Sequence, residues 1–158
     1  MKGLINGLVS IIAGGLLYAF YACTALVQKV NTAFGSTSDA MNVYDIIKTD
    51  SQYLPDTVKT YKIFAIIAMV IAGLLVVAGI ISLLANLKVF KFKQANLVNV
   101  VVATLFLVIA IIVFIFGFVM ASDCTTTFVK ASSGFANYAV LVLGLAAFVG
   151  TLLTRKTK

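Results

Sequence analysis

Residues 63–87 read IFAIIAMVIAGLLVVAGIISLLANL and contain no charged residue. Three more charge-free runs cover residues 3–28, 94–122 and 131–154. Each run is long enough for a helix to cross a ~30 Å hydrocarbon core, which takes roughly 20 apolar residues. A helix also satisfies every backbone N–H and C=O within lipid. Because the runs do not alternate apolar and polar residues as barrel strands do, we predict an all-α integral membrane protein with four transmembrane helices.

The four runs predict one membrane domain. Apolar residues make up 62% of the chain, against about half in a typical soluble domain. Short connections favour antiparallel neighbours, as in an up-down four-helix bundle. The predicted domain covers 1–158, with spans at about 4–27, 63–86, 97–121 and 134–153, outer loops at about 29–60 and 122–132, and an inner loop at about 87–96.

The distribution of charge predicts the orientation. With the N terminus inside, the inner segments hold seven cations and no acid: Lys2, Lys88, Lys91, Lys93, Arg155, Lys156 and Lys158. The outer segments balance five lysines with five aspartates: Lys29, Lys48, Lys59, Lys62 and Lys130 with Asp39, Asp45, Asp50, Asp56 and Asp123. Since short cytoplasmic loops carry the excess of Lys and Arg, we expect both termini to be cytoplasmic, in a plasma (cytoplasmic) membrane.

The inner lysines also bear on the choice of partner. Their clusters are short, and the positive-inside rule accounts for them, so we expect a lipid bilayer and no nucleic acid as partner. Lys88, Lys91 and Lys93 alternate with Phe90 and Phe92, a pattern that favours contact with anionic lipid at ~1 kcal/mol per cation. An ordinary inner loop is the simpler interpretation.

The first outer loop contains helix signals. We expect the first helix to reach about Phe34, with Gly35 as its C-cap. The stretch 36–39, Ser-Thr-Ser-Asp, fits a capping pattern and predicts a short outer amphipathic helix over 39–48. Pro55 suits the start of the second long helix. The short helix would present three residues on one face as a candidate contact with a partner protein: Met41, Tyr44 and Ile47.

Small residues recur at helical spacing within the runs. Hydrophobicity cannot drive helices together in lipid, but small residues let backbones approach closely. A repeat of seven keeps one face toward its partners in a left-handed bundle, so we predict that these faces meet inside one subunit. We call them the small-residue faces, and they comprise Gly3, Gly7, Ser10, Gly14, Ala65, Ala68, Ala72, Gly79, Ser82, Ala103, Ala110 and Gly117.

The sequence lacks the residues that several kinds of chemistry require. The chain has no His, Glu or Trp, and none of the four runs contains a charged residue, although buried ionisable groups mark proton relays and ion coupling. No pattern predicts a catalytic, metal or cofactor site. Cys23 and Cys124 fall at similar depth near the outer ends of two helices, where a disulfide is one possibility and two free thiols are the other.

Five asparagines lie near the ends of the spans: Asn6, Asn86, Asn96, Asn99 and Asn137. We interpret them as helix caps and as polar groups that are solvated at the membrane–water interface. Hydrogen bonds between helices, or a polar path, are the alternatives.

The layout of four spans with a larger first outer loop is similar to claudin-like, MARVEL-type and connexin-like tetraspans. The similarity covers topology alone, because the Gly-Leu-Trp…Cys…Cys loop signature is absent. The leading hypothesis is a non-enzymatic structural or assembly subunit that associates with itself or with a larger membrane complex. The alternative is an oligomeric channel, with Asn99 and Thr104 lining a path between subunits.

Overall fold

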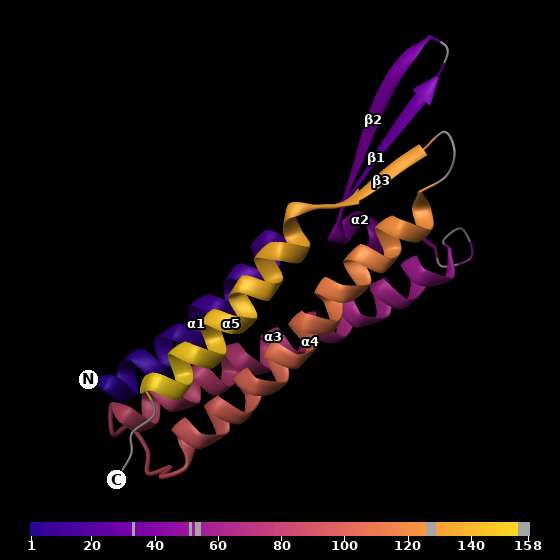
Figure 1. The fold of residues 1–158 in the computed structure, drawn as a ribbon. Helices are drawn as coiled ribbons and strands as arrows, with labels where there is room; N and C mark the ends of the chain where they lie inside the picture. Colours follow the sequence, from indigo (N-terminus) through magenta and orange to yellow (C-terminus); the bar gives the residue numbers. More distant parts are fainter. Residues whose placement is uncertain (33, 51, 53–54, 126–128, 155–158) are drawn as a thin grey trace.

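The computed structural model describes residues 1–32, 34–50, 52, 55–125 and 129–154. It contains four long helices and a small sheet (Figure 1). The elements are α1 (Lys2–Phe20), β1 (Thr24–Thr32), β2 (Gly35–Asn42), α2 (Val43–Lys48), α3 (Asp56–Asn86), α4 (Ala95–Cys124), β3 (Val129–Ser133) and α5 (Phe135–Thr154). By length and composition α1, α3, α4 and α5 can each cross a membrane, as the four charge-free runs predicted.

The long helices pack in a closed order. Helix α1 contacts α3 and α5, α3 contacts α4, and α4 contacts α5. The start of α1, the end of α5 and the α3–α4 connection lie at one end, which we call the terminal end (Figure 1). The sheet lies at the other, the sheet end.

The all-α prediction is wrong at the sheet end. The first helix stops at Phe20, not near residue 27 or 34, and the next residues form a three-stranded antiparallel sheet of order β2-β1-β3. In β1 the β-branched residues Thr24, Val27, Val30 and Thr32 favour an extended chain. Gly35 has a φ of 130°, which a side chain would disfavour, and it starts β2 after the hairpin turn rather than capping a helix.

The short helix lies between the first two long helices, but it begins later than predicted. Residues 36–39 belong to β2, so the predicted capping pattern there is wrong. Asn42 caps α2 instead. Its Oδ1 accepts from the Asp45 backbone N–H at 2.8 Å, and Asp45 Oδ2 accepts from the Asn42 N–H at 3.4 Å. This reciprocal box satisfies two backbone donors that the start of the helix leaves open.

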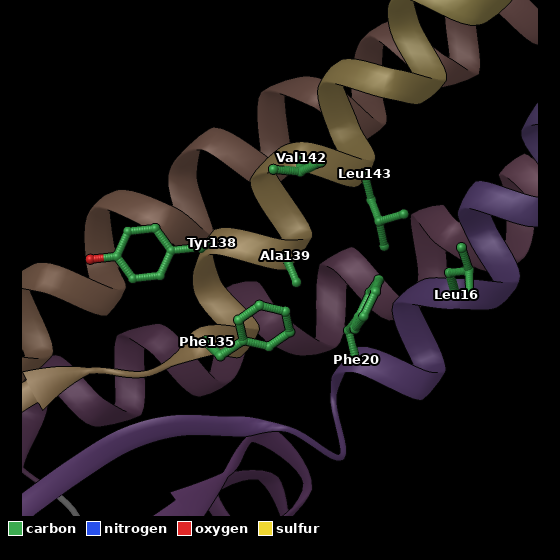
Figure 2. Close-up of a pocket in the computed structure, with 7 residues that line it drawn as sticks. All are labelled: Leu16, Phe20, Phe135, Tyr138, Ala139, Val142 and Leu143. Carbon is green, nitrogen blue, oxygen red and sulfur yellow. The ribbon is translucent and has the colours of Figure 1, made fainter.

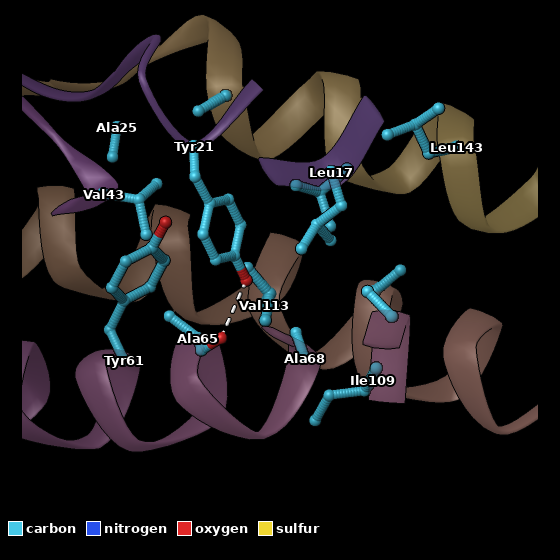
Figure 3. Packing of buried hydrophobic residues seen from close by; sticks show 14 of the residues in the cluster. Leu17, Tyr21, Ala25, Val43, Tyr61, Ala65, Ala68, Ile109, Val113 and Leu143 are labelled. Carbon is cyan, nitrogen blue, oxygen red and sulfur yellow. Dashed lines mark hydrogen bonds between the residues drawn. The ribbon is translucent and has the colours of Figure 1, made fainter. Parts of the chain in front are cut away.

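The core fills the space between the helices and continues beneath the sheet. Figure 3 shows Leu17 and Tyr21 from the α1 side directed toward Ala65 and Ala68 of α3. Tyr21 is fully buried, and its hydroxyl donates to the Ala65 carbonyl at 2.9 Å.

Helix α3 ends with a left-handed residue. Lys88 has a φ of 62°, its N–H donates to Ala85 O at 3.2 Å, and the Val89 N–H donates to Leu84 O at 3.1 Å. This pair of bonds is a Schellman motif, in which glycine is the usual left-handed residue. The lysine therefore occupies a conformation that costs a side chain roughly 1–2 kcal/mol.

Replacement of Lys88 by glycine is expected to stabilise the protein. Relief of the left-handed strain should raise the melting temperature in detergent by roughly 2–4 °C for about 1 kcal/mol. Lys91→Gly removes the same charge from the same exposed connection and is the control, because Lys91 itself does not have a positive φ. Equal melting temperatures for the two variants would contradict the expectation.

Candidate functional site

All twelve residues of the small-residue faces are buried. The structure brings those of α1 against α3. A Cβ added to Gly7 would lie 2.7 Å from Gly79 O, and one added to Gly79 would lie 2.8 Å from Gly7 O. Further along, a Cβ on Gly14 would lie 2.7 Å from Ala72 O. Backbone therefore meets backbone along this interface, which leaves no room for larger side chains.

This close approach positions a polar cluster at the terminal end, with Asn6 of α1 at its centre. The Asn6 amide nitrogen donates to Thr151 O of α5 at 2.7 Å and to Thr154 Oγ1 at 3.2 Å. Its Oδ1 accepts from Asn99 Nδ2 of α4 at 2.7 Å and lies 3.4 Å from Ser82 Oγ of α3, whose single hydrogen is shared between Asn6 and Asn96. One buried side chain thus joins all four long helices.

The cluster extends between α3 and α4. Asn96 Oδ1 accepts from Ser82 Oγ at 2.6 Å and from Asn86 Nδ2 at 2.8 Å. An added Cβ on Gly3 would overlap Asn86, so the glycine makes room for this amide. The terminal-end asparagines therefore hydrogen-bond between helices, which corrects our interpretation of them as caps. Asn99 Oδ1 is buried without a partner among the described residues.

A second polar cluster lies at the sheet end. Tyr61 of α3 donates its hydroxyl to Asn137 Oδ1 of α5 at 2.5 Å. Asn137 Nδ2 in turn donates to Ala25 O of β1 at 3.0 Å and to Ser133 Oγ at 2.8 Å. A Cβ on Gly117 of α4 would lie 2.5 Å from Asn137 Nδ2, so this glycine makes room for the amide. The cluster fixes the sheet to the helices.

The predicted partner-contact residues face inward. Met41, Tyr44 and Ile47 are partly buried and pack against the chain's own core. The Tyr44 hydroxyl donates to Tyr18 O at 2.7 Å, and the Tyr18 hydroxyl donates to Met69 O at 2.7 Å. Met41 lies on β2 rather than on the short helix. These side chains tie α2 to α1 and α3, so they belong to the scaffold of the sheet end.

The surface that the sheet does expose is the β1–β2 hairpin, which extends beyond the ends of the long helices (Figure 1). Phe34 is fully exposed at its tip, and the first six of the eight residues of β2 are exposed as well. We call residues 34–40 the hairpin surface. Among the described strands, β2 lies at the edge of the sheet and pairs with β1 alone. Sequence reasoning missed this surface because it ended the first helix near Phe34 and started a short helix at residue 39, where the structure has a strand.

The remaining predicted residues are placed as follows. Cys23 and Cys124 are both partly buried free thiols, so the structure contains no bridge between them. Lys88, Lys91 and Lys93 are exposed in the α3–α4 connection at the terminal end. The side chain of Lys2 and the predicted cytoplasmic residues Arg155, Lys156 and Lys158 lie outside what the structure describes.

The described residues contain no group of three or more His, Cys, Asp or Glu side chains that could hold a metal ion. No protein-family model matches the chain, and a search of curated proteins finds no match. The exposure of Phe34 and of the first six residues of β2 makes the hairpin surface the candidate functional site. It stands on a scaffold held by one polar cluster at each end.

Proposed function

We propose that the chain is a non-enzymatic structural or assembly subunit of a membrane complex. In this proposal the four long helices form an antiparallel, left-handed bundle in the plasma membrane. The inner loop and both termini lie in the cytoplasm with the excess lysines, and the hairpin stands on the outer side. The protein would associate laterally with itself or with a larger complex.

The observation that carries this proposal is the hairpin surface. A fully exposed phenylalanine at the tip of a projecting hairpin has no role in the chain's own core. Beside it runs an exposed edge strand that contains neither Lys nor Pro and whose single charged residue is Asp39. An exposed apolar side chain beside the edge strand of a sheet suits a protein partner.

The interior polar groups support an assembly role over a channel. Asn99, proposed from the sequence to line a path, is fully buried and donates to Asn6 within the same chain. Thr104 is exposed, but its hydroxyl donates to Val100 O of its own helix at 2.9 Å. Both groups thus form hydrogen bonds within one subunit.

The test is the mass of the protein extracted in mild detergent from its own membrane, measured by native mass spectrometry. We expect either several copies or a particle that contains a second protein. Phe34→Ser is expected to reduce the associated fraction roughly tenfold, because an anchoring aromatic is typically worth more than 1 kcal/mol. Phe90→Ser, at the opposite end and 40% exposed, is the control.

A wild-type particle that is a lone monomer, or equal association of the two variants, would count against the proposal. A closed ring of copies that conducts ions in a planar bilayer would instead establish the channel alternative.

A further inference from the structure

Three exposed lysines lie in the α3–α4 connection at the terminal end (Figure 1): Lys88, Lys91 and Lys93. Residues 87–94 contain no acidic residue, and none of the three lysines forms an ion pair with a described residue. The connection therefore presents positive charge without a counter-charge of its own. Neither polar cluster nor the hairpin surface includes these lysines.

Membrane topology accounts for cations in this connection but not for the position of Lys88. The positive-inside rule counts the cations of a short loop and does not depend on where in the loop they stand. Lys88 is the left-handed residue of the Schellman motif, with a φ of 62°, and glycine would be free of strain there. Val89 and Gln94 are exposed and have no positive φ, so either position would carry the same charge without strain. A strained residue that is kept in this way indicates that its side chain is needed at that place.

The apolar surface of the helices sets the depth of the lysines. Leu87, directly before Lys88, is 54% exposed, and Leu97, four residues after Lys93, is 39% exposed. In the proposed membrane location, hydrocarbon covers both leucines, so the lysines lie within about one helical turn of its boundary. Lysine side chains near helix ends extend from there to the headgroup layer. The three ammonium groups are therefore at the depth of lipid phosphates.

We propose that these lysines bind the phosphate groups of anionic phospholipids in the adjacent leaflet. Their charge selects an anion, and their depth places lipid headgroups against them. Val89 and Phe92 stand between the lysines and are 66% and 41% exposed. The same lipids cover these two side chains, whereas a soluble acidic protein would have to enter the headgroup layer to do so. This inference rests on the membrane location in the proposed function, but not on the hairpin.

The test is tryptophan fluorescence in bilayers that mix phosphatidylglycerol with phosphatidylcholine. The chain contains no tryptophan, so Phe92→Trp places a single reporter among the lysines. Phe135→Trp is the control reporter, in the wall of a recess between α1 and α5 that is lined by apolar and aromatic residues (Figure 2). The lipid composition stays constant, and brominated acyl chains are placed on one lipid or on the other. Quenching then gives the relative association constant of the two lipids at each reporter.

Each cation near the surface favours an anionic lipid about fivefold. Phosphatidylglycerol should therefore be preferred at least about fivefold at the Phe92→Trp reporter and close to equally at the Phe135→Trp reporter. The preference should fall in about 1 M salt, where the Debye length is roughly 3 Å. Equal constants at the two reporters would overturn the proposal and leave the membrane location intact. No quenching at either reporter would overturn the membrane location as well.

Two changes at Lys88 in the Phe92→Trp protein separate the charge from the fold. Lys88→Gly should lower the preference about fivefold, although the same change is expected to raise the melting temperature. Lys88→Arg keeps the cation and should keep the preference. Lys130→Gln, at an exposed lysine of the sheet end, should leave it unchanged.

Two results with Lys88→Gly would contradict the proposal. One is an unchanged preference for phosphatidylglycerol. The other is the loss of an associated protein in native mass spectrometry while the lipid preference persists, which would identify an acidic protein as the partner of the lysines.

Discussion

Replacement of Gly79 by leucine is expected to reduce the yield of folded protein severely. Any Cβ at this position approaches Gly7 O within 2.8 Å and Ser10 Cβ within 3.0 Å, so α1 and α3 must separate. Overpacking of this kind costs roughly 1–3 kcal/mol, and the separation also breaks the bond from Ser82 to Asn6. We expect a total near 4 kcal/mol, measured by unfolding in a denaturing detergent.

Val77→Leu is the matched control, because Val77 lies on the same helix and is 53% exposed. It should change stability by less than about 0.5 kcal/mol, as surface substitutions usually do. Similar losses for the two variants would show that the α1–α3 contact does not limit folding.

The second large effect is expected for Asn6→Leu. The side chain bonds to Thr151, Thr154, Ser82 and Asn99, and each interhelical bond in a membrane contributes roughly 0.6–1.7 kcal/mol. We expect a loss of about 3 kcal/mol, measured in the same unfolding assay. Asn99 Nδ2 keeps the Asn6 backbone carbonyl at 3.1 Å and Ser82 Oγ keeps Asn96 Oδ1 at 2.6 Å, so the loss comes from the bonds of the Asn6 side chain itself.

Two further variants make this prediction specific. Thr104→Val removes an exposed hydroxyl that bonds within its own helix and should change little. Asn99→Leu should be destabilising alone but add less than its full effect to Asn6→Leu, because the two side chains share bonds. If the loss of stability in the double variant equalled the sum of the two single losses, the two asparagines would not belong to one cluster.

The four long helices were predictable because a charge-free apolar run of that length has few other stable conformations. The end of the first helix was not predictable. Residues 24–28 carry no charge, so composition alone joined them to the helix, although Thr24 and Val27 favour a strand. Strand pairing also depends on β3, more than a hundred residues further along the chain, and a local pattern does not reveal such a partner.

Residues of the candidate site were only partly predictable. Regular spacing identified the small side chains, but the pairing of Gly7 with Gly79 depends on tertiary packing. The asparagines were visible as polar residues near span ends, whereas their partners are remote in sequence. Met41, Tyr44 and Ile47 were assigned to a partner protein because an apolar face seeks apolar surface. The nearest such surface is the chain's own core.

The bond from Asn6 to Thr151 spans 145 positions of the chain, which has a consequence for biosynthesis. The first helix emerges from the ribosome long before its acceptor exists, so the ring of helices can close only after translation of the last one. Until then the Asn6 amide nitrogen in the nascent chain has neither of the acceptors that it contacts in the finished protein. A polypeptide released before residue 151 would lack both acceptors of the Asn6 amide nitrogen, Thr151 O and Thr154 Oγ1.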